Sequence, residues 1–248
     1  MSDILERAAR KEARMKVRSF GLARGLAFGA GAAALGYAGL VAWHRARYGK
    51  VNHIAEPSAG ELLDRFIPSP EVLEHHHIAI AAPAELTLAA AKEMRFMDSP
   101  LVKAIIKARE LAMGGAPDPR VHPPELLAQM QSIGWVVLAE RPGREVVMGA
   151  ATMPWHASPV FRSISPGEFE AFREPGYVKI AWSLRADPVD DSHCIFHTET
   201  RVSTTEPQAR ERFKRYWSFV APGVELIRIA MLQPLKREAE RRAGGHAA

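Results

Sequence analysis

The feature that most constrains the fold is a periodic row of large apolar residues near the end of the chain. Between residues 207 and 242 these residues recur at intervals of three or four positions, which places them on one face of an α-helix. The row consists of Phe213, Trp217, Val220, Val224, Ile227, Met231 and Leu235. A helix this long with one apolar face must pack against another layer of structure.

Three residues predict how this helix begins and bends. Thr205 is expected to cap its N-terminus, and Pro207 suits its first turn. Pro222 lies in the middle of the helix, where a proline removes a backbone hydrogen bond and is expected to kink the axis.

Upstream of this helix, several segments carry the alternating pattern of half-buried strands. In 178–186, Val178, Ile180, Trp182 and Leu184 share one face. Further strands are expected within 74–84, 133–140, 146–153 and 194–204, separated by turn residues. Helices are expected after Pro83 and after Ser99, the second ending at Gly114 and Gly115, with a short helix around Glu61–Phe66.

The order of these elements predicts an α+β fold. One strand is followed by two helices, a run of antiparallel strands and the long C-terminal helix. A curved antiparallel sheet around that helix is the simplest way to bury its apolar face.

Two segments resemble the START-like superfamily, also called SRPBCC or helix-grip, which includes polyketide cyclase/dehydrase-like proteins. They are HHHIAIAAPAELTLAAA at 75–91 and HTETRVSTTEPQARERFKRYWSFVAPGVELIRIAMLQPLKREAE at 197–240. The resemblance covers about residues 70–242 and is to uncharacterised bacterial members. It implies a mostly apolar cavity between the sheet and the C-terminal helix, and hydrophobic or amphipathic ligands. It implies no particular activity, because the same fold hosts carriers, sensors and enzymes.

The distribution of charge argues against nucleic-acid binding. Residues 1–50 contain ten Lys/Arg and three Asp/Glu, a net charge of +7, whereas the remaining residues contain 23 and 25, a net charge of −2. The predicted domain therefore lacks the dense basic face that binds a phosphate backbone.

Residues 25–43 contain no charged side chain and are long enough to cross a bilayer core. Arg24 and Arg45 flank the segment, and most basic residues precede it. A single-pass membrane anchor is expected, with the N-terminus in the cytoplasm and the domain on the far side. A buried Ala/Gly-rich helix and a cleaved signal peptide are the alternatives. Gly21, Gly25 and Gly29 would permit a homodimer through this helix.

The expected organisation is a basic arm at 1–24, a transmembrane helix at 25–43, a linker at 44–70, a START-like domain at 71–242 and a disordered tail at 243–248. Cys194 is the only cysteine, so no intrachain disulfide forms. No phosphate-binding loop or nucleotide fingerprint occurs in the domain, and no cofactor is expected.

Two sets of residues are candidates for a site. Aromatic and aliphatic residues suited to lining a pocket are Trp135, Trp182, Phe213, Trp217, Val220, Ile227 and Met231. On the strand 194–204, alternation turns either Phe196, Thr198, Thr200 and Val202 inward, or Ile195, His197, Glu199 and Arg201. If the second set faces inward, His197, Glu199 and Arg201 form a polar centre capable of acid–base catalysis. His75 and His77 share a strand face, but no third ligand is identifiable and no metal site is expected.

The leading functional hypothesis is a membrane-tethered protein that binds a lipid or other hydrophobic small molecule between the sheet and the C-terminal helix. The alternatives are a cyclase or dehydratase acting on a hydrophobic substrate, and an interaction domain that binds no ligand.

Overall fold

The computed structural model describes Gly36, Gly39 and residues 61–246. The predicted basic arm, most of the predicted membrane anchor and the first part of the predicted linker lie outside the described residues. Gly36 and Gly39 are helical. Within the described part of the chain, no helix combines the length and the hydropathy needed to span a bilayer.

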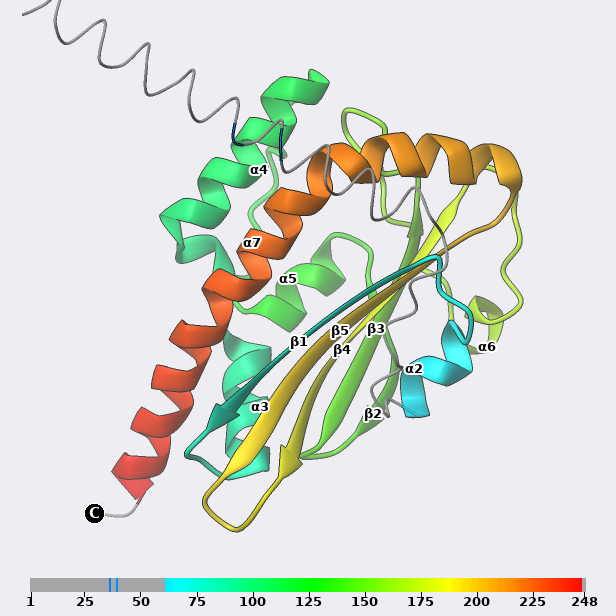
Figure 1. Cartoon of the computed structure of the whole chain (residues 1–248). Coiled ribbons are helices and arrows are strands. Elements are labelled where there is room, and N and C mark those ends of the chain that lie inside the picture. Colours follow the sequence, from blue (N-terminus) through cyan, green and yellow to red (C-terminus); the bar gives the residue numbers. More distant parts are fainter. Residues whose placement is uncertain (1–35, 37–38, 40–60, 247–248) are drawn as a thin grey trace, which may run out of the picture.

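The centre of the fold is a curved sheet of five antiparallel strands in the order β1-β5-β4-β3-β2 (Figure 1). The first strand pairs with the last, so the two segments that carry the family resemblance are neighbours. Every predicted strand is confirmed. The strands are β1 (Val72–Ile80), β2 (Val136–Arg141), β3 (Glu145–Thr152), β4 (Val178–Pro188) and β5 (Cys194–Thr204).

Both helices predicted between the first two strands are confirmed, as α3 (Ala84–Glu93) and α4 (Pro100–Met113). Ser99 caps α4 by accepting a hydrogen bond from the backbone of Val102, and Gly114 ends it in the left-handed conformation. Three short helices were not predicted. They are η1 (Phe96–Asp98), α5 (Leu126–Ser132) and α6 (Pro166–Phe169).

The long C-terminal helix is confirmed as α7 (Pro207–His246). Its axis bends in the orange part of Figure 1, which contains Pro222 as predicted. The helix continues past residue 242, so residues 243–246 are helical rather than the expected disordered tail. The Thr205 cap prediction is wrong, because the Thr205 hydroxyl donates to the backbone carbonyl of Tyr177 and accepts from its N–H.

The sheet has two differently covered faces. The face that contacts α3, α5 and α7 is called here the inner face, and the opposite face, which carries α2 (Glu61–Phe66), the outer face (Figure 1). Inner-face residues of β4 include Ile180, Trp182 and Leu184, the set predicted to share one face. On β5, the inner set consists of Phe196, Thr198, Thr200 and Val202.

The helix predicted at Glu61–Phe66 is confirmed, but it belongs to the folded body rather than to a linker. Leu63, Phe66 and Ile67 are at most 2% exposed and pack with Val147 and Ala181 of the sheet. The outer face therefore has a hydrophobic core of its own, and the folded part includes residues that precede the predicted start at 71.

Candidate ligand-binding site

The apolar face of α7 is packed at its two ends and less covered in its middle. Phe213, Trp217 and Val220 at one end, and Leu235 at the other, are at most 7% exposed. The stripe residues between them, Val224, Ile227 and Met231, are only half-buried. The stripe therefore leaves accessible apolar surface in the middle of α7, between two packed ends.

The sheet beneath the middle of α7 is also incompletely covered. Ile180 lies on the inner face of β4, the central strand of the sheet, and is only half-buried. Trp182, two residues further, meets Trp135 edge-on with ring centroids 6.1 Å apart. The indole N–H of Trp135 is buried and has no hydrogen-bond acceptor within the described residues. At the centre of the inner face, a partly accessible Ile180 therefore lies two residues along β4 from a buried pair of tryptophans.

A cation lies among these apolar groups. Arg228 projects from α7 to the inner face of β5, where its guanidinium donates to the hydroxyl of Thr198 at 3.4 Å and to that of Thr200 at 2.5 Å. Burial lowers the pKa of Arg228 to about 10, a shift that the charge of Glu74 opposes. Part of its surface remains accessible.

Two ionisable residues of β1 face the same region. Glu74 pairs with Thr200 in the strand register, and His76 pairs with Thr198, so both lie beside the hydroxyls that bind Arg228. Burial, and then the charge of Arg228, lowers the pKa of His76, while Glu225 opposes the shift. His76 is therefore neutral at pH 7, and its Nε2 has no partner among the described residues.

The predicted pocket residues lie in different surroundings. Phe213, Trp217 and Val220 form a packed cluster with Val178 and Val202. Trp135 and Trp182 belong to the cluster that includes Leu235. Ile227 and Met231 border the accessible middle of α7.

The structure turns His197, Glu199 and Arg201 to the outer face, so the condition for a polar centre beneath α7 is not met. Arg201 is 1% exposed and donates to the carboxylates of Glu199 at 2.6 Å and Asp64 at 2.5 Å. It also donates to the backbone carbonyl of Ile67 at 3.0 Å. These bonds join β5 to α2.

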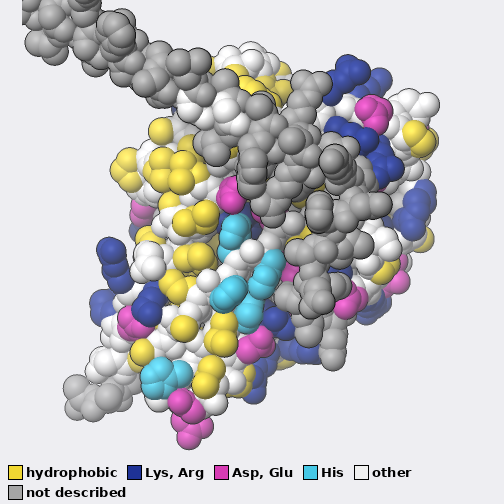
Figure 2. Space-filling model, in the orientation of Figure 1, with side chains coloured by type: hydrophobic (Ala, Val, Ile, Leu, Met, Phe, Trp, Pro, Cys, Tyr) yellow, Lys and Arg dark blue, Asp and Glu magenta, His cyan; other side chains and the backbone are white. Residues whose placement is uncertain are grey.

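His197 belongs to a row of three stacked imidazoles on the outer face. Its ring centroid lies 5.3 Å from that of His75 and 5.8 Å from that of His77, and His75 Nε2 is 3.1 Å from His197 Nδ1. Burial, and then the charge of Arg185, lowers the pKa of His197 to about 4, while Asp187 opposes the shift. Figure 2 shows histidine side chains gathered over β1 and β5. Within residues 61–246, no group of three His, Cys, Asp or Glu side chains has a geometry that could hold a metal ion.

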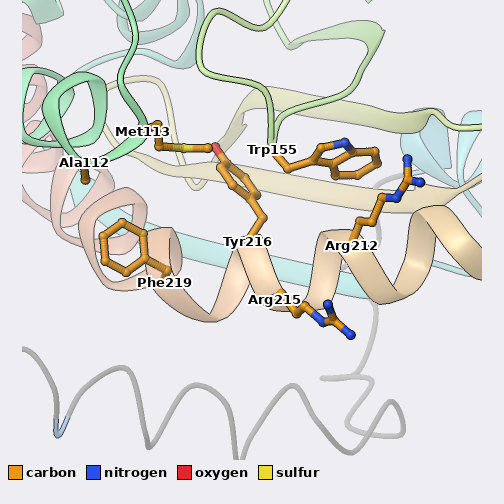
Figure 3. A pocket seen from close by; sticks show the side chains of 7 residues that line it. All are labelled: Ala112, Met113, Trp155, Arg212, Arg215, Tyr216 and Phe219. Atoms are coloured by element: carbon orange, nitrogen blue, oxygen red, sulfur yellow. The ribbon is translucent and has the colours of Figure 1, made fainter.

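A separate groove of about 510 Å³ lies on the surface between the end of α4, the loop at Trp155 and the first half of α7. Figure 3 shows Met113 extending toward Tyr216 across this groove, with Trp155 beside it. Its lining is largely apolar, with two arginines on the α7 side. The residues are Ala112, Met113, Trp155, Arg212, Arg215, Tyr216 and Phe219.

The polar residues of the inner site were missed at the level of sequence. Arg228 directly follows Ile227 of the apolar stripe, so a charge at the edge of that stripe was the available signal. Thr198 and Thr200 belong to one of the two sets of β5 residues that alternation could turn inward, but nothing in the sequence pattern marks them as residues of a binding site. Glu74 and His76 alternate with His75 and His77 along β1, and strand alternation alone did not show which pair faces α7.

Neither a family model nor a curated protein matches the chain. Solved structures similar to it include DR_A0006 of Deinococcus radiodurans, at 12% identity over 58% of this chain and 94% of that one, with a TM-score of 0.26. CalU16 of Micromonospora echinospora is 12% identical over 70% and 86%, with a TM-score of 0.25. The Zhui aromatase/cyclase of Streptomyces sp. R1128 is 13% identical over 69% and 94%, with a TM-score of 0.22.

Proposed function

We infer that this protein, whose curved antiparallel sheet and long C-terminal helix form a helix-grip architecture, binds a hydrophobic small molecule between the inner face of the sheet and the middle of α7. One observation carries the proposal. The apolar stripe of α7 is packed at Val220 and Leu235 but half-buried at Val224, Ile227 and Met231, and Ile180 of the sheet, which packs against the same cluster as Val224, is also half-buried.

The physical reason is the cost of leaving apolar surface in water. Each Å² of apolar surface removed from water contributes about 25 cal/mol. A ligand that covers Ile180, Ile227 and Met231 therefore gains binding energy from surface that the folded chain leaves open. Small-molecule sites are typically apolar and aromatic with a few polar groups, which is the composition found around Trp135 and Trp182.

Filling the space with a larger side chain tests this function. The neutral fluorescent probe N-phenyl-1-naphthylamine is titrated into the full-length protein and into variants Ile227→Trp and Met231→Trp. We expect the two variants to bind the probe at least about tenfold more weakly, because the added ring occupies the volume that the probe needs.

Leu226→Trp is the matched control. Leu226 precedes Ile227 on α7 but is 46% exposed, so its substitution adds the same ring outside the space. Thermal unfolding of all variants shows which of them retain the fold. Unchanged binding by folded Ile227→Trp and Met231→Trp proteins would place the probe elsewhere, for example in the groove beside Tyr216, and would refute the proposal.

Membrane tethering by residues 25–43 remains part of the proposal. It is supported by the uncharged segment and by the arginines that flank it. Extraction of membranes with alkaline carbonate tests whether the chain is integral, and protease protection tests whether the domain lies on the far side. Crosslinking in membranes, compared with a Gly25→Leu variant, tests the proposed homodimer. Release of the full-length chain by carbonate would rule out the anchor.

One observation favours an enzyme, a cyclase or dehydratase, as the second candidate. His76 is neutral at pH 7, faces the same space as Arg228 and has a ring nitrogen without a partner. Such an imidazole can accept or donate a proton. The protein and a His76→Asn variant are incubated with extracted hydrophobic metabolites. A mass loss of one water that requires His76 would support a dehydratase, whereas identical mass spectra would oppose it.

A further inference from the structure

Arg228 is a deeply placed cation whose hydrogen-bonding capacity the protein does not satisfy. A guanidinium has five N–H donors. Arg228 uses two of its nitrogens on the neutral hydroxyls of Thr198 and Thr200. Its Nε–H is buried and has no acceptor, and within residues 61–246 no carboxylate forms an ion pair with it.

Such a charge is normally paired with an anion. Removal of an ion from water is costly, and buried charges in proteins are therefore hydrogen-bonded to opposite charges. Arg201 of the same sheet follows this rule, since it binds Glu199 and Asp64. Arg228 does not, although it lies on the face of the sheet where accessible space remains.

Further ionisable side chains lie near Arg228. His76 adds a ring nitrogen without a partner on the neighbouring strand. Glu74 attracts Arg228 through space, and Glu225 is the second carboxylate that acts on this region. Within residues 61–246, Arg228 has hydroxyl oxygens as its acceptors and its Nε–H has no acceptor, so this donor remains available to a ligand.

We propose that the ligand is an amphiphile with an anionic oxygen, a carboxylate or a phenolate, and that Arg228 with Thr198, Thr200 and His76 binds this group. This inference rests on the proposed function, because it places the head group within the same space. Arginine is suited to the role because its planar N–H groups can bind two oxygens of one carboxylate.

The positions of the aromatic residues give the direction of the apolar part of the ligand. Thr200 pairs with Trp182 in the register of β4 and β5, and Trp182 contacts Trp135. With its head group at Arg228, a ligand can lie across the inner face over Ile180 and Trp182 toward Trp135. The head is then on the β5 side, and the tail is over the centre of the sheet.

A matched pair of probes separates this inference from the proposed function. The full-length protein is titrated with 12-(9-anthroyloxy)stearic acid and with its methyl ester, which have the same apolar tail and differ in the charged head. We expect the acid to bind about ten- to a hundredfold more tightly than the ester, the effect of a charge-assisted hydrogen bond. Arg228→Met should reduce this ratio to about one while leaving the affinity for the ester nearly unchanged.

Two further variants complete the test. Lys236→Met removes another α7 cation, whose Nζ donates to the backbone carbonyl of Ala79 at the exposed edge, and should leave the ratio unchanged. Arg228→Lys keeps the charge and should retain part of the preference for the acid.

Equal binding of the acid and the ester by the unmodified protein would overturn the proposed anionic head group and leave the proposed function standing. If neither probe binds, and N-phenyl-1-naphthylamine also fails to bind, the proposed function fails as well. An acid preference that persists in folded Arg228→Met would overturn the role of Arg228.

Discussion

At the scale of single residues, the two arginines on opposite faces of the sheet differ in burial and pairing, which distinguishes a structural charge from the charge proposed to bind a ligand. Arg201 is 1% exposed and binds two carboxylates and a carbonyl, so its charge is compensated by the protein. Arg228 binds only two hydroxyls. Both side chains have one buried nitrogen without an acceptor within residues 61–246, so the difference between them is that Arg201 is paired with carboxylates and Arg228 with neutral hydroxyls.

The two arginines should therefore differ in their effect on stability. Arg201→Met leaves the buried carboxylate of Glu199 without its guanidinium and is expected to lower the free energy of unfolding by about 3–5 kcal/mol. Arg228→Met removes a cation without an ion-pair partner and is expected to cost less than about 1.5 kcal/mol. Urea denaturation measures both values. A larger loss from Arg228→Met than from Arg201→Met would contradict this account.

Lys179 provides a prediction about pH. It is 4% exposed on the outer face, where burial lowers its pKa from 10.5 to about 8. Between pH 8 and 10.5 the unfolded chain holds a proton that the folded chain has lost, so the free energy of unfolding contributed by Lys179 rises with pH across this window. Below pH 8 both states are protonated, and the cost of burying the charge is fully present.

Replacement of Lys179 by Met should therefore stabilise the protein at pH 7 by about 1–3 kcal/mol. The gain should shrink as the pH rises from 8 to 10.5. Denaturation midpoints at a series of pH values test the slope. A constant difference between the two proteins at every pH would show that the effect comes from packing against Phe169, over whose ring the ammonium lies, rather than from the charge.

At the scale of elements, α4 is the most weakly held of the long helices. Val102 is its only buried residue, and Figure 2 shows hydrophobic side chains gathered over it. Much of its attachment comes from Arg109, which donates to the Tyr216 hydroxyl at 3.3 Å and to the backbone carbonyls of Pro154 and His156. This one side chain joins α4 to α7 and to the loop at Trp155.

Loss of Arg109 should loosen this helix locally. Arg109→Ala is expected to speed amide hydrogen exchange in residues 100–113 by about tenfold, because it removes hydrogen bonds worth about 1–2 kcal/mol in total. Exchange in β4 should stay unchanged. Lys107→Ala, which breaks only an exposed pair with Glu110, is the control and should have little effect. Equal acceleration throughout the chain would instead indicate global destabilisation.

The elements that sequence patterns predicted are those with a long period or a clear start and stop. α7 repeats its apolar residues over several turns, and α4 has both Ser99 and Gly114 at its ends. α5 has only seven residues and no side-chain cap at Glu125, so it lacks both signals. Leu126, Leu127 and Met130 pack against the inner core, and tertiary contacts rather than local propensity account for this helix.

At the scale of the whole molecule, the sheet separates two cores with different roles. The inner core lies beneath α3, α5 and α7 and includes the proposed binding site. The outer core is closed by α2, whose Leu63 and Phe66 are almost fully buried. This second layer packs on the face of the sheet opposite the proposed binding site.

The outer core should therefore control stability without controlling binding. Phe66→Ala creates a cavity beside Phe169 and is expected to cost about 3–5 kcal/mol. The affinity of the remaining folded protein for N-phenyl-1-naphthylamine should be unchanged at a temperature well below its unfolding transition. Arg65→Ala, at an exposed ion pair with Glu170, should alter neither property. A stable Phe66→Ala protein would show that α2 is dispensable.

The amino-acid sequence by itself determined the order of the strands and main helices along the chain. It also determined the approximate length and the apolar face of α7, because helical and strand periods are properties of neighbouring residues. Only the tertiary structure decided which face of β5 turns inward, because each of the two alternating sets of residues on this strand contains both apolar and polar side chains. Tertiary packing also placed α2 over Arg201 and Glu199, which closes that face. It left Arg228 opposite Thr198 and Thr200 with unused donors, because that outcome depends on how α7, β1 and β5 meet in space.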